Sequence, residues 1–161
     1  MRTTPRDRGT RSLVRRAINL ALTVMTMWVF AGCATIQPPD NATKCKRVIE
    51  TTGYCKCKKC CNWRRNWRGK AVIASGKNEG KTKKVGVTAS GTKAKRGVIA
   101  ADTSRYPFGT VMYVPGYGYG RVEDRGSAIN GDHIDLCFKS HKEALKWGRQ
   151  KNEVVVWVQK R

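Results

Sequence analysis

Residues 97–138 read GVIAADTSRYPFGTVMYVPGYGYGRVEDRGSAINGDHIDLCF, in which short apolar runs alternate with glycine and proline turns. The runs VIAA, RVE and HIDLCF are typical of β-strands that end at sharp turns. The whole chain carries 11 acidic residues against 33 basic ones. Five of those acids nevertheless fall in this one segment, at Asp102, Glu123, Asp124, Asp132 and Asp135. Carboxylates gathered at strand ends in so basic a protein predict a site that handles a proton, a metal or a sugar.

Apolar and β-branched runs bounded by turn residues continue on both sides of this segment. They predict strands at residues 48–54, 85–90, 98–102, 110–114, 120–124, 134–138 and 154–159. A helix is predicted to begin after Ser140, because Ser140 and Glu143 make a capping box and Lys146 lies near the negative end of the helix dipole. Six or seven short strands with one C-terminal helix predict a mainly β fold, in the form of a small closed barrel.

Residues 1–32 have the pattern of a lipoprotein signal peptide. Arginines precede an apolar run at residues 17–30, which is too short to span a bilayer core of about 30 Å comfortably. Small residues directly before Cys33 resemble a lipobox, in which that cysteine is acylated; cleavage by the general signal peptidase is the alternative. We therefore expect a lipid anchor at Cys33, a tether at residues 33–47 and a single domain at residues 48–161. This places the protein in the cell envelope, at an outer membrane facing the periplasm.

The formal net charge of +22 favours a polyanionic partner. Export argues against nucleic acid, and the sequence lacks the interleaved aromatic and basic residues typical of a groove for single strands. A polymer of the cell envelope is the expected partner.

Cysteines are dense in the block YCKCKKCC at residues 54–61, which has C-x-C and C-x-x-C spacings. An oxidising envelope favours disulfides, and small exported domains gain stability from them. The same spacings suit zinc or another thiophilic metal, so that alternative stays open. The only histidines, His133 and His141, are isolated in the sequence. We therefore expect disulfides rather than a metal site, and no cofactor.

Four motifs carry a resemblance to a known family. They are A-x-D followed by P-x-G-T, E-D-x-G-x-A-I-x-G, an I-D pair entering a strand, and the helix S-H-x-E-A-L-x-W-G-R. Together they resemble the three-aspartate (3D) domain, which is related to the C-terminal part of membrane-bound lytic murein transglycosylase A. The resemblance covers roughly residues 48–158, and its three aspartates are Asp102, Asp124 and Asp135. Asn130 and Ser127 depart from the residues common in the family.

The resemblance implies a six-stranded double-psi β-barrel and an enzyme that cleaves peptidoglycan. The bond is the β-1,4 bond between N-acetylmuramic acid and N-acetylglucosamine, and the product is a 1,6-anhydro sugar formed without water. Asp135 is expected to be the catalytic acid, with Asp124 and Asp102 supporting it. The residues expected to contact the substrate are Thr88, Gly126, Ala128 and Tyr117.

The chemistry asks that one carboxylic acid keep its proton near working pH, so its pKa must be raised. Asp135 lies between apolar residues on a strand, where burial raises a carboxyl pKa, and a neighbouring Asp124 would raise it further. Asp102 precedes Thr-Ser and a turn, so a capping role is an equal alternative for it. Two other functions remain open: a non-catalytic wall-binding barrel and a cysteine-rich metal-binding lipoprotein.

Overall fold

The structure is a computed structural model that describes residues 35–159. The expected signal peptide and Cys33 lie outside these residues. No helix within them is both long and apolar enough to cross a membrane. The elements in chain order are β1 (Ala42–Tyr54), α2 (Lys58–Cys61), β2 (Trp63–Arg65), β3 (Ala71–Ile73), β4 (Val98–Ala101), β5 (Val111–Val114), β6 (Gly118–Asp124), β7 (His133–Cys137), α3 (His141–Trp147) and β8 (Gln150–Gln159).

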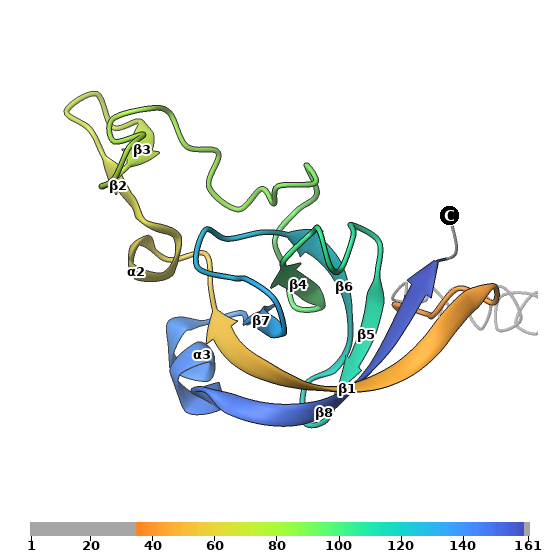
Figure 1. Ribbon diagram of the computed structural model, residues 1–161. Helices are drawn as coiled ribbons and strands as arrows, with labels where there is room; N and C mark the ends of the chain where they lie inside the picture. Colours follow the sequence, from red (N-terminus) through yellow and green to blue (C-terminus); the bar gives the residue numbers. More distant parts are fainter. Residues whose placement is uncertain (1–34, 160–161) are drawn as a thin grey trace, which may run out of the picture. The chain divides into compact units, whose positions relative to one another are not determined.

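Six of the described strands close into a barrel in the order β1-β7-β4-β6-β5-β8 (Figure 1). The pairs β1–β7 and β4–β6 are parallel, whereas the other neighbours are antiparallel. A parallel pair needs a crossover connection, so the barrel is not a simple meander. The prediction of a mainly β fold, with a small closed barrel and a C-terminal helix, is confirmed.

Alternate residues of the barrel strands fill its interior, as the period of two requires. The largest side chains there are fully buried and almost all apolar, which makes this cluster the main source of hydrophobic stabilisation. They are Ile49, Ile99, Tyr106, Met112, Val114, Val122, Ile134, Leu136, Val154 and Val156.

A second, smaller cluster lies on the outer side of the barrel wall. It comprises Tyr54, Ala94, Val98, Ala100 and Cys137, with Cys60 and Cys61 packed against it. The strand residues in this cluster alternate with those of the interior, so they face outward. The α2 segment and the loop before β4 therefore cover this part of the wall rather than leaving it to solvent.

The helix α3 begins where the capping box predicts. Ser140 is its N-cap, and its hydroxyl oxygen accepts a hydrogen bond from the backbone N–H of Glu143. The helix packs closely on β1 because Gly53 has no side chain: a Cβ atom there would lie 2.9 Å from the carbonyl oxygen of Ala144.

One strand prediction is wrong, and one pair of strands was missed. Residues 85–90 do not form a strand, and only an isolated bridge between Val87 and Lys93 occurs there. Conversely, β2 and β3 form a hairpin that the sequence did not predict, because each strand has only three residues. β1 begins at Ala42 and pairs with β8 from there on, so residues 42–47 of the expected tether belong to the barrel.

Candidate active site

Two of the three predicted aspartates meet on the outer side of the barrel through a shared neighbour. Ala100 on β4 pairs in register with Asp135 on β7 and, on its other side, with Asp124 at the end of β6. Residues in register on neighbouring strands face the same side, so both carboxylates flank the small Ala100 side chain. Because neighbouring strands lie about 4.8 Å apart, the two aspartate Cα atoms are about 10 Å apart.

A β-bulge brings Asp124 into this row. The register of the β4–β6 pair shifts between Ile99 and Ala100, so Ile99 pairs with Val122 whereas Ala100 pairs with Asp124. Without this shift of register, Ala100 would pair with Glu123 instead. Bulges commonly re-aim a side chain beside an active site, and this one selects which acid faces Asp135.

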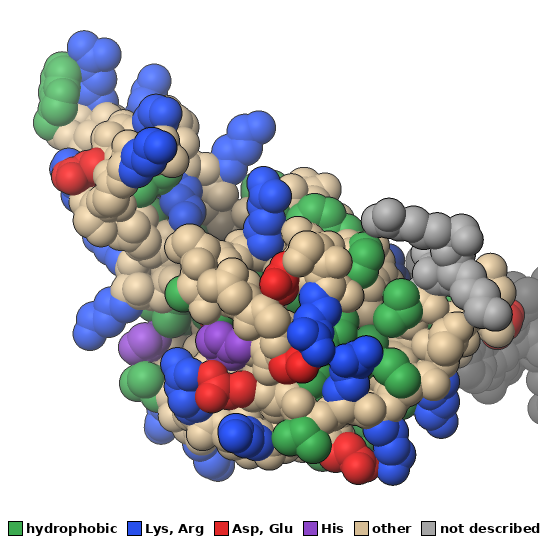
Figure 2. All heavy atoms as spheres, viewed as in Figure 1, with side chains coloured by type: hydrophobic (Ala, Val, Ile, Leu, Met, Phe, Trp, Pro, Cys, Tyr) green, Lys and Arg blue, Asp and Glu red, His purple; other side chains and the backbone are tan. Residues whose placement is uncertain are grey.

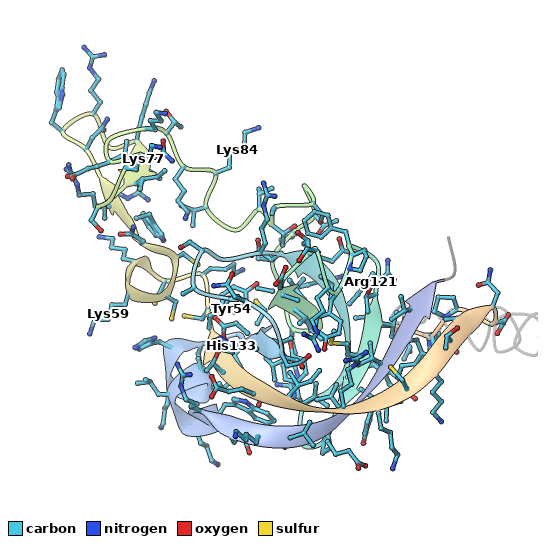
Figure 3. The ribbon with its side chains drawn as sticks, in the orientation of Figure 1. Tyr54, Lys59, Lys77, Lys84, Arg121 and His133 are labelled. Carbon is cyan, nitrogen blue, oxygen red and sulfur yellow. The ribbon has the colours of Figure 1, made fainter. Side chains whose placement is uncertain are left out.

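Both carboxylates line a cleft of about 380 Å³. Its walls come from the end of β1, the α2 segment, the loop at residues 83–87 and the loop at residues 125–129. Four basic side chains also line it, those of Lys56, Lys83, Lys84 and Arg125. In Figure 3, Lys84 points away from the ribbon of its loop. Figure 2 shows lysine and arginine side chains spread over the barrel and the β2–β3 hairpin, with few acids between them. The cleft thus combines two carboxylates with a positive rim.

Asp135 has the electrostatic setting of a proton donor. Burial raises the pKa of Asp135 above its ordinary value of 3.8. The hydroxyl of Thr52 donates a hydrogen bond of 3.0 Å to Oδ1 of Asp135, which favours the ionised form and lowers this pKa. The charge of His133 lowers it too, and the Asp124 carboxylate raises it, but both effects are smaller than that of burial. The pKa of Asp135 is therefore raised overall.

Thr52 and His133 are site residues that sequence reasoning missed. Thr52 lies opposite Asp135 on β1, and its Oγ1 is 3.0 Å from Nε2 of His133. The hydroxyl has a single proton, which it gives to Asp135, so we assign the proton of the second contact to His133 Nε2. The spacing His133-x-Asp135 places both side chains on one face of a strand. The pairing of β7 with a parallel strand some eighty residues earlier gave no local signal.

Asp124 is held by three donors. The Tyr54 hydroxyl donates to Oδ2 at 3.2 Å, while the backbone N–H groups of Ala89 and Arg125 donate to Oδ1 at 3.0 and 2.9 Å. These contacts fix the carboxylate and also tie the loop before β4 to the end of β6. Figure 3 labels Tyr54 at the end of β1, beside the start of the cysteine block.

Asp102 does not line the cleft. Its Oδ1 accepts hydrogen bonds from the N–H and the hydroxyl of Ser104, at 3.0 and 2.6 Å. Its Oδ2 accepts from the N–H of Gly131 at 3.0 Å. These bonds, led by that of the Ser104 hydroxyl, lower the pKa of Asp102. The capping alternative therefore describes Asp102 best, and through Gly131 it anchors one end of the loop that walls the cleft.

Of the four residues expected to contact the substrate, only Gly126 lines the cleft. Ala128 is exposed outside it. Tyr117 is not among the residues that line the cleft. Its side chain is buried, its hydroxyl donates to the carbonyl of Cys137, and it accepts from the N–H of Gly97, each at 2.8 Å. Thr88 is also buried, and its hydroxyl bonds to Thr92 within a turn. Neither hydroxyl is available to a sugar.

The cysteines differ from expectation. The six in the described range, Cys45, Cys55, Cys57, Cys60, Cys61 and Cys137, are free thiols, so the expected disulfides are not confirmed. His141 is not isolated in space: its Nδ1 lies 3.3 Å from Sγ of Cys60 and 3.6 Å from Sγ of Cys57. A histidine with cysteines around it can hold a metal, so the metal alternative that the cysteine spacings left open gains His141 as a candidate ligand.

Sequence comparison finds a match to a known family in the C-terminal part of the chain. Residues 97–160 match the family model of the 3D domain. The chain is 41% identical over 69 residues to the "Putative cell wall shaping protein YabE" of Bacillus subtilis, covering 40% of this chain and 17% of that protein. It is 40% identical over 67 residues to the cell wall-binding protein YocH of the same organism, covering 39% of this chain and 23% of that protein. The chain thus spans less than a quarter of either relative.

Solved structures of Escherichia coli MltA also resemble the chain. One matches with a TM-score of 0.40 and 24% identity, over 50% of this chain and 30% of that one. MltA with bound chitohexaose matches with a TM-score of 0.39 and 20% identity, over 47% and 28%. The family match spans β4 to β8 and includes all three aspartates. The match to the 3D domain family thus lies in residues 97–160 of this chain.

Proposed function

We propose that this protein is a lytic transglycosylase. It cleaves the β-1,4 bond between N-acetylmuramic acid and N-acetylglucosamine in peptidoglycan and leaves a 1,6-anhydro end. The observation that carries the proposal is the pairing of Asp135 and Asp124 on either side of Ala100, in one cleft, with burial raising the pKa of Asp135. A proton donor beside a second, firmly held carboxylate is the equipment that glycosidic cleavage requires.

Asp135 serves first as acid and then as base. Its Oδ1 accepts from Thr52, so the proton sits on Oδ2 and passes to the glycosidic oxygen as the C1–O bond breaks. The oxygen of the muramic acid 6-hydroxyl then bonds to C1, and its proton returns to Asp135. The carboxyl ends as it began, one glycosidic bond is exchanged for one anhydro bond, and no water is consumed.

Asp124 stabilises the positive charge that develops on the sugar ring as the bond breaks. The donors from Tyr54, Ala89 and Arg125 hold its carboxylate in one orientation before the substrate arrives. A preorganised charge of this kind costs no rearrangement during the reaction. The lysines at the cleft rim suit the carboxylates on the peptide stems of the wall polymer.

A wall-binding barrel without catalysis is the second candidate. The similarity to YocH, a cell wall-binding protein, and the high positive charge of this chain favour it. In that case the two aspartates accept hydrogen bonds from glycan hydroxyls, and the rim supplies adhesion.

Digestion of purified sacculi separates the two candidates. Wild-type protein and the Asp135→Asn variant are each incubated with sacculi, and the soluble products are analysed by mass spectrometry. Transglycosylation predicts anhydro-muropeptides from wild-type protein only, while both proteins sediment with sacculi. Sedimentation with no anhydro products from wild-type protein favours the binding module. Hydrolysed, reducing ends would contradict the proposed ring closure.

We propose also that Cys33 carries a lipid that holds the protein in the cell envelope, with residues 34–41 as the connection to the barrel. These residues contain none of the cleft-lining side chains. Cys33→Ser is expected to release the protein from membranes at unchanged specific activity on soluble glycan. Retention of that variant in the membrane fraction at high salt would contradict the anchor.

A further inference from the structure

We propose that Cys55, Cys57, Cys60 and His141 bind one thiophilic divalent metal ion, with Zn²⁺ as the best fit. The Sγ atoms of the three cysteines and a ring nitrogen of His141 all lie within 4.8 Å of one another. The three cysteines precede the segment that matches the 3D family, and His141 lies inside it. The site joins two distant parts of the chain and does not depend on the proposed enzymatic activity.

Three of the distances between the ligand atoms are close to those of a tetrahedron around zinc. Zn–S bonds of about 2.3 Å and Zn–N bonds of about 2.0 Å place sulfurs about 3.8 Å apart and sulfur about 3.5 Å from nitrogen. The Sγ atoms of Cys55 and Cys60 are 3.8 Å apart. Nδ1 of His141 lies 3.6 Å from Sγ of Cys57 and 3.3 Å from Sγ of Cys60. An ion fits among these atoms with little movement of the chain.

The local backbone structure supports Cys57 as a metal-binding thiolate. Cys57 is the N-cap of α2, and the backbone N–H of Cys60 donates to its Sγ at 3.4 Å. An N–H directed at a thiolate favours the charged form that binds metal, and such supporting bonds are a general feature of metal sites. Three neighbouring lysines on the exposed side, Lys56, Lys58 and Lys59, offset the charge of three thiolates. Figure 3 shows Lys59 pointing outward from α2.

The metal would cross-link three segments of the chain at the edge of the cleft. Cys55 directly follows β1, and His141 is the first residue of α3, so one ion joins the end of a barrel strand, α2 and the start of a helix. Cys60 lines the cleft as well as belonging to the metal cluster, and its neighbour Cys61 lines it too. None of the α2 residues is fully buried, and only Cys60 and Cys61 pack against the outer cluster, so packing gives this segment limited support. A metal supplies the missing constraint.

A disulfide is the competing fate of the same sulfurs. A bond between Cys55 and Cys60 needs their Sγ atoms to approach from 3.8 Å to about 2.05 Å. It would also remove two of the four ligands. Metal and disulfide therefore exclude each other at this site, and a single preparation can distinguish them.

The experiment uses the whole chain, purified without chelator or added reductant. Elemental analysis is expected to find one zinc per chain, and a thiol assay under denaturing conditions with chelator should find the ligand cysteines reduced. Exchange into Co²⁺ should give thiolate-to-cobalt charge-transfer bands and the d–d bands of tetrahedral cobalt. Cys57→Ser should reduce metal content and thermal stability. Cys61→Ser is the matched control, because it lies beside Cys60 but outside the cluster, and it should keep the metal.

His141→Cys guards against variants that simply fail to fold. It keeps four ligands, so it should still bind Co²⁺, with a stronger charge-transfer band from a fourth thiolate. Any one of three results would overturn the proposal: a Cys55–Cys60 disulfide in the purified wild-type protein, no stoichiometric uptake of Zn²⁺ or Co²⁺ by the reduced protein, or unchanged cobalt spectra in His141→Cys.

Discussion

The hydroxyl of Thr52 on β1 donates a 3.0 Å hydrogen bond to Oδ1 of Asp135 on β7, across a parallel strand pair. This bond lowers the pKa of Asp135, whereas burial raises it by more. A residue that opposes the raised pKa of an acid must serve another purpose. We infer that it fixes which carboxyl oxygen keeps the proton, so that Oδ2 faces the glycan.

Replacing Thr52 therefore separates its effect on the orientation of the Asp135 carboxyl group from its effect on the pKa of that group. Thr52→Val keeps the shape of the side chain but removes the donor, so the pKa of Asp135 should rise and the alkaline limb of the activity profile should move to higher pH. The maximal rate should nevertheless fall about tenfold, because the loss of one positioning bond costs about 1–1.5 kcal/mol. Thr52→Ser should restore the rate. A valine variant as fast as wild type would remove the orienting role.

Asp135→Asn should reduce anhydro-sugar formation by a factor of about 10² to 10⁴, the usual contribution of a general acid. The same change should stabilise the fold at neutral pH. Because the folded-state pKa is raised, the folded protein holds this proton more tightly than the unfolded chain does, and the wild type loses stability as pH rises above 3.8. Asparagine has no such loss. Melting temperatures of the two proteins should diverge toward neutral pH and converge in acid; the opposite order would contradict the raised pKa.

Tyr117→Phe tests the assignment of Tyr117 to the core. Its buried hydroxyl bonds to the backbone of Gly97 and Cys137, and removing it leaves both without that partner. The expected cost is about 1–3 kcal/mol of unfolding free energy, with cleavage activity preserved. The control is Tyr119→Phe, because that side chain is 41% exposed, and it should change neither. A loss of glycan binding in Tyr117→Phe at unchanged stability would return Tyr117 to the site.

Most of the barrel follows from local patterns in the sequence. Runs such as VIAA and HIDLCF have the period and bounds of strands, and Ser140 with Glu143 marked the start of α3. The hairpin of β2 and β3 could not be predicted in this way, because three-residue strands are too short to show a period. Residues 85–90 have strand-like composition, yet Gly86 has a φ of +78° and the segment turns. Composition there was overridden by backbone geometry.

The arrangement of the candidate site depends more on how the strands pair than on local sequence motifs. The motifs identified Asp124 and Asp135, but only the bulge at Ile99 and Ala100 explains why Asp124 rather than Glu123 faces the cleft. Thr52 and His133 join Asp135 through a parallel pairing that no local spacing encodes. Likewise, His141 stands far from the cysteines in sequence and meets them only because α3 packs on the end of β1.

The pH dependence of cleavage offers the sharpest test of the two-carboxylate site. Cleavage needs Asp135 protonated, so its pKa sets the alkaline limb of the profile. Asp124 raises that pKa, and Asp124→Asn should move the limb to lower pH. The His133 charge lowers it, and His133→Gln should move the limb to higher pH while the amide still donates to Thr52. Both shifts should be smaller than the shift that burial imposes.

The opposite signs make the pair of variants informative, because a general disturbance of the site would not move the limb in two directions. The double variant should fall between the two single ones, since Asp124 and His133 approach Asp135 from different strands and share no hydrogen bond with each other. Suppose instead that Asp124→Asn lowers the rate and leaves the limb in place. Asp124 then acts only by orienting the glycan or stabilising its positive charge, and the raised pKa of Asp135 rests on burial alone.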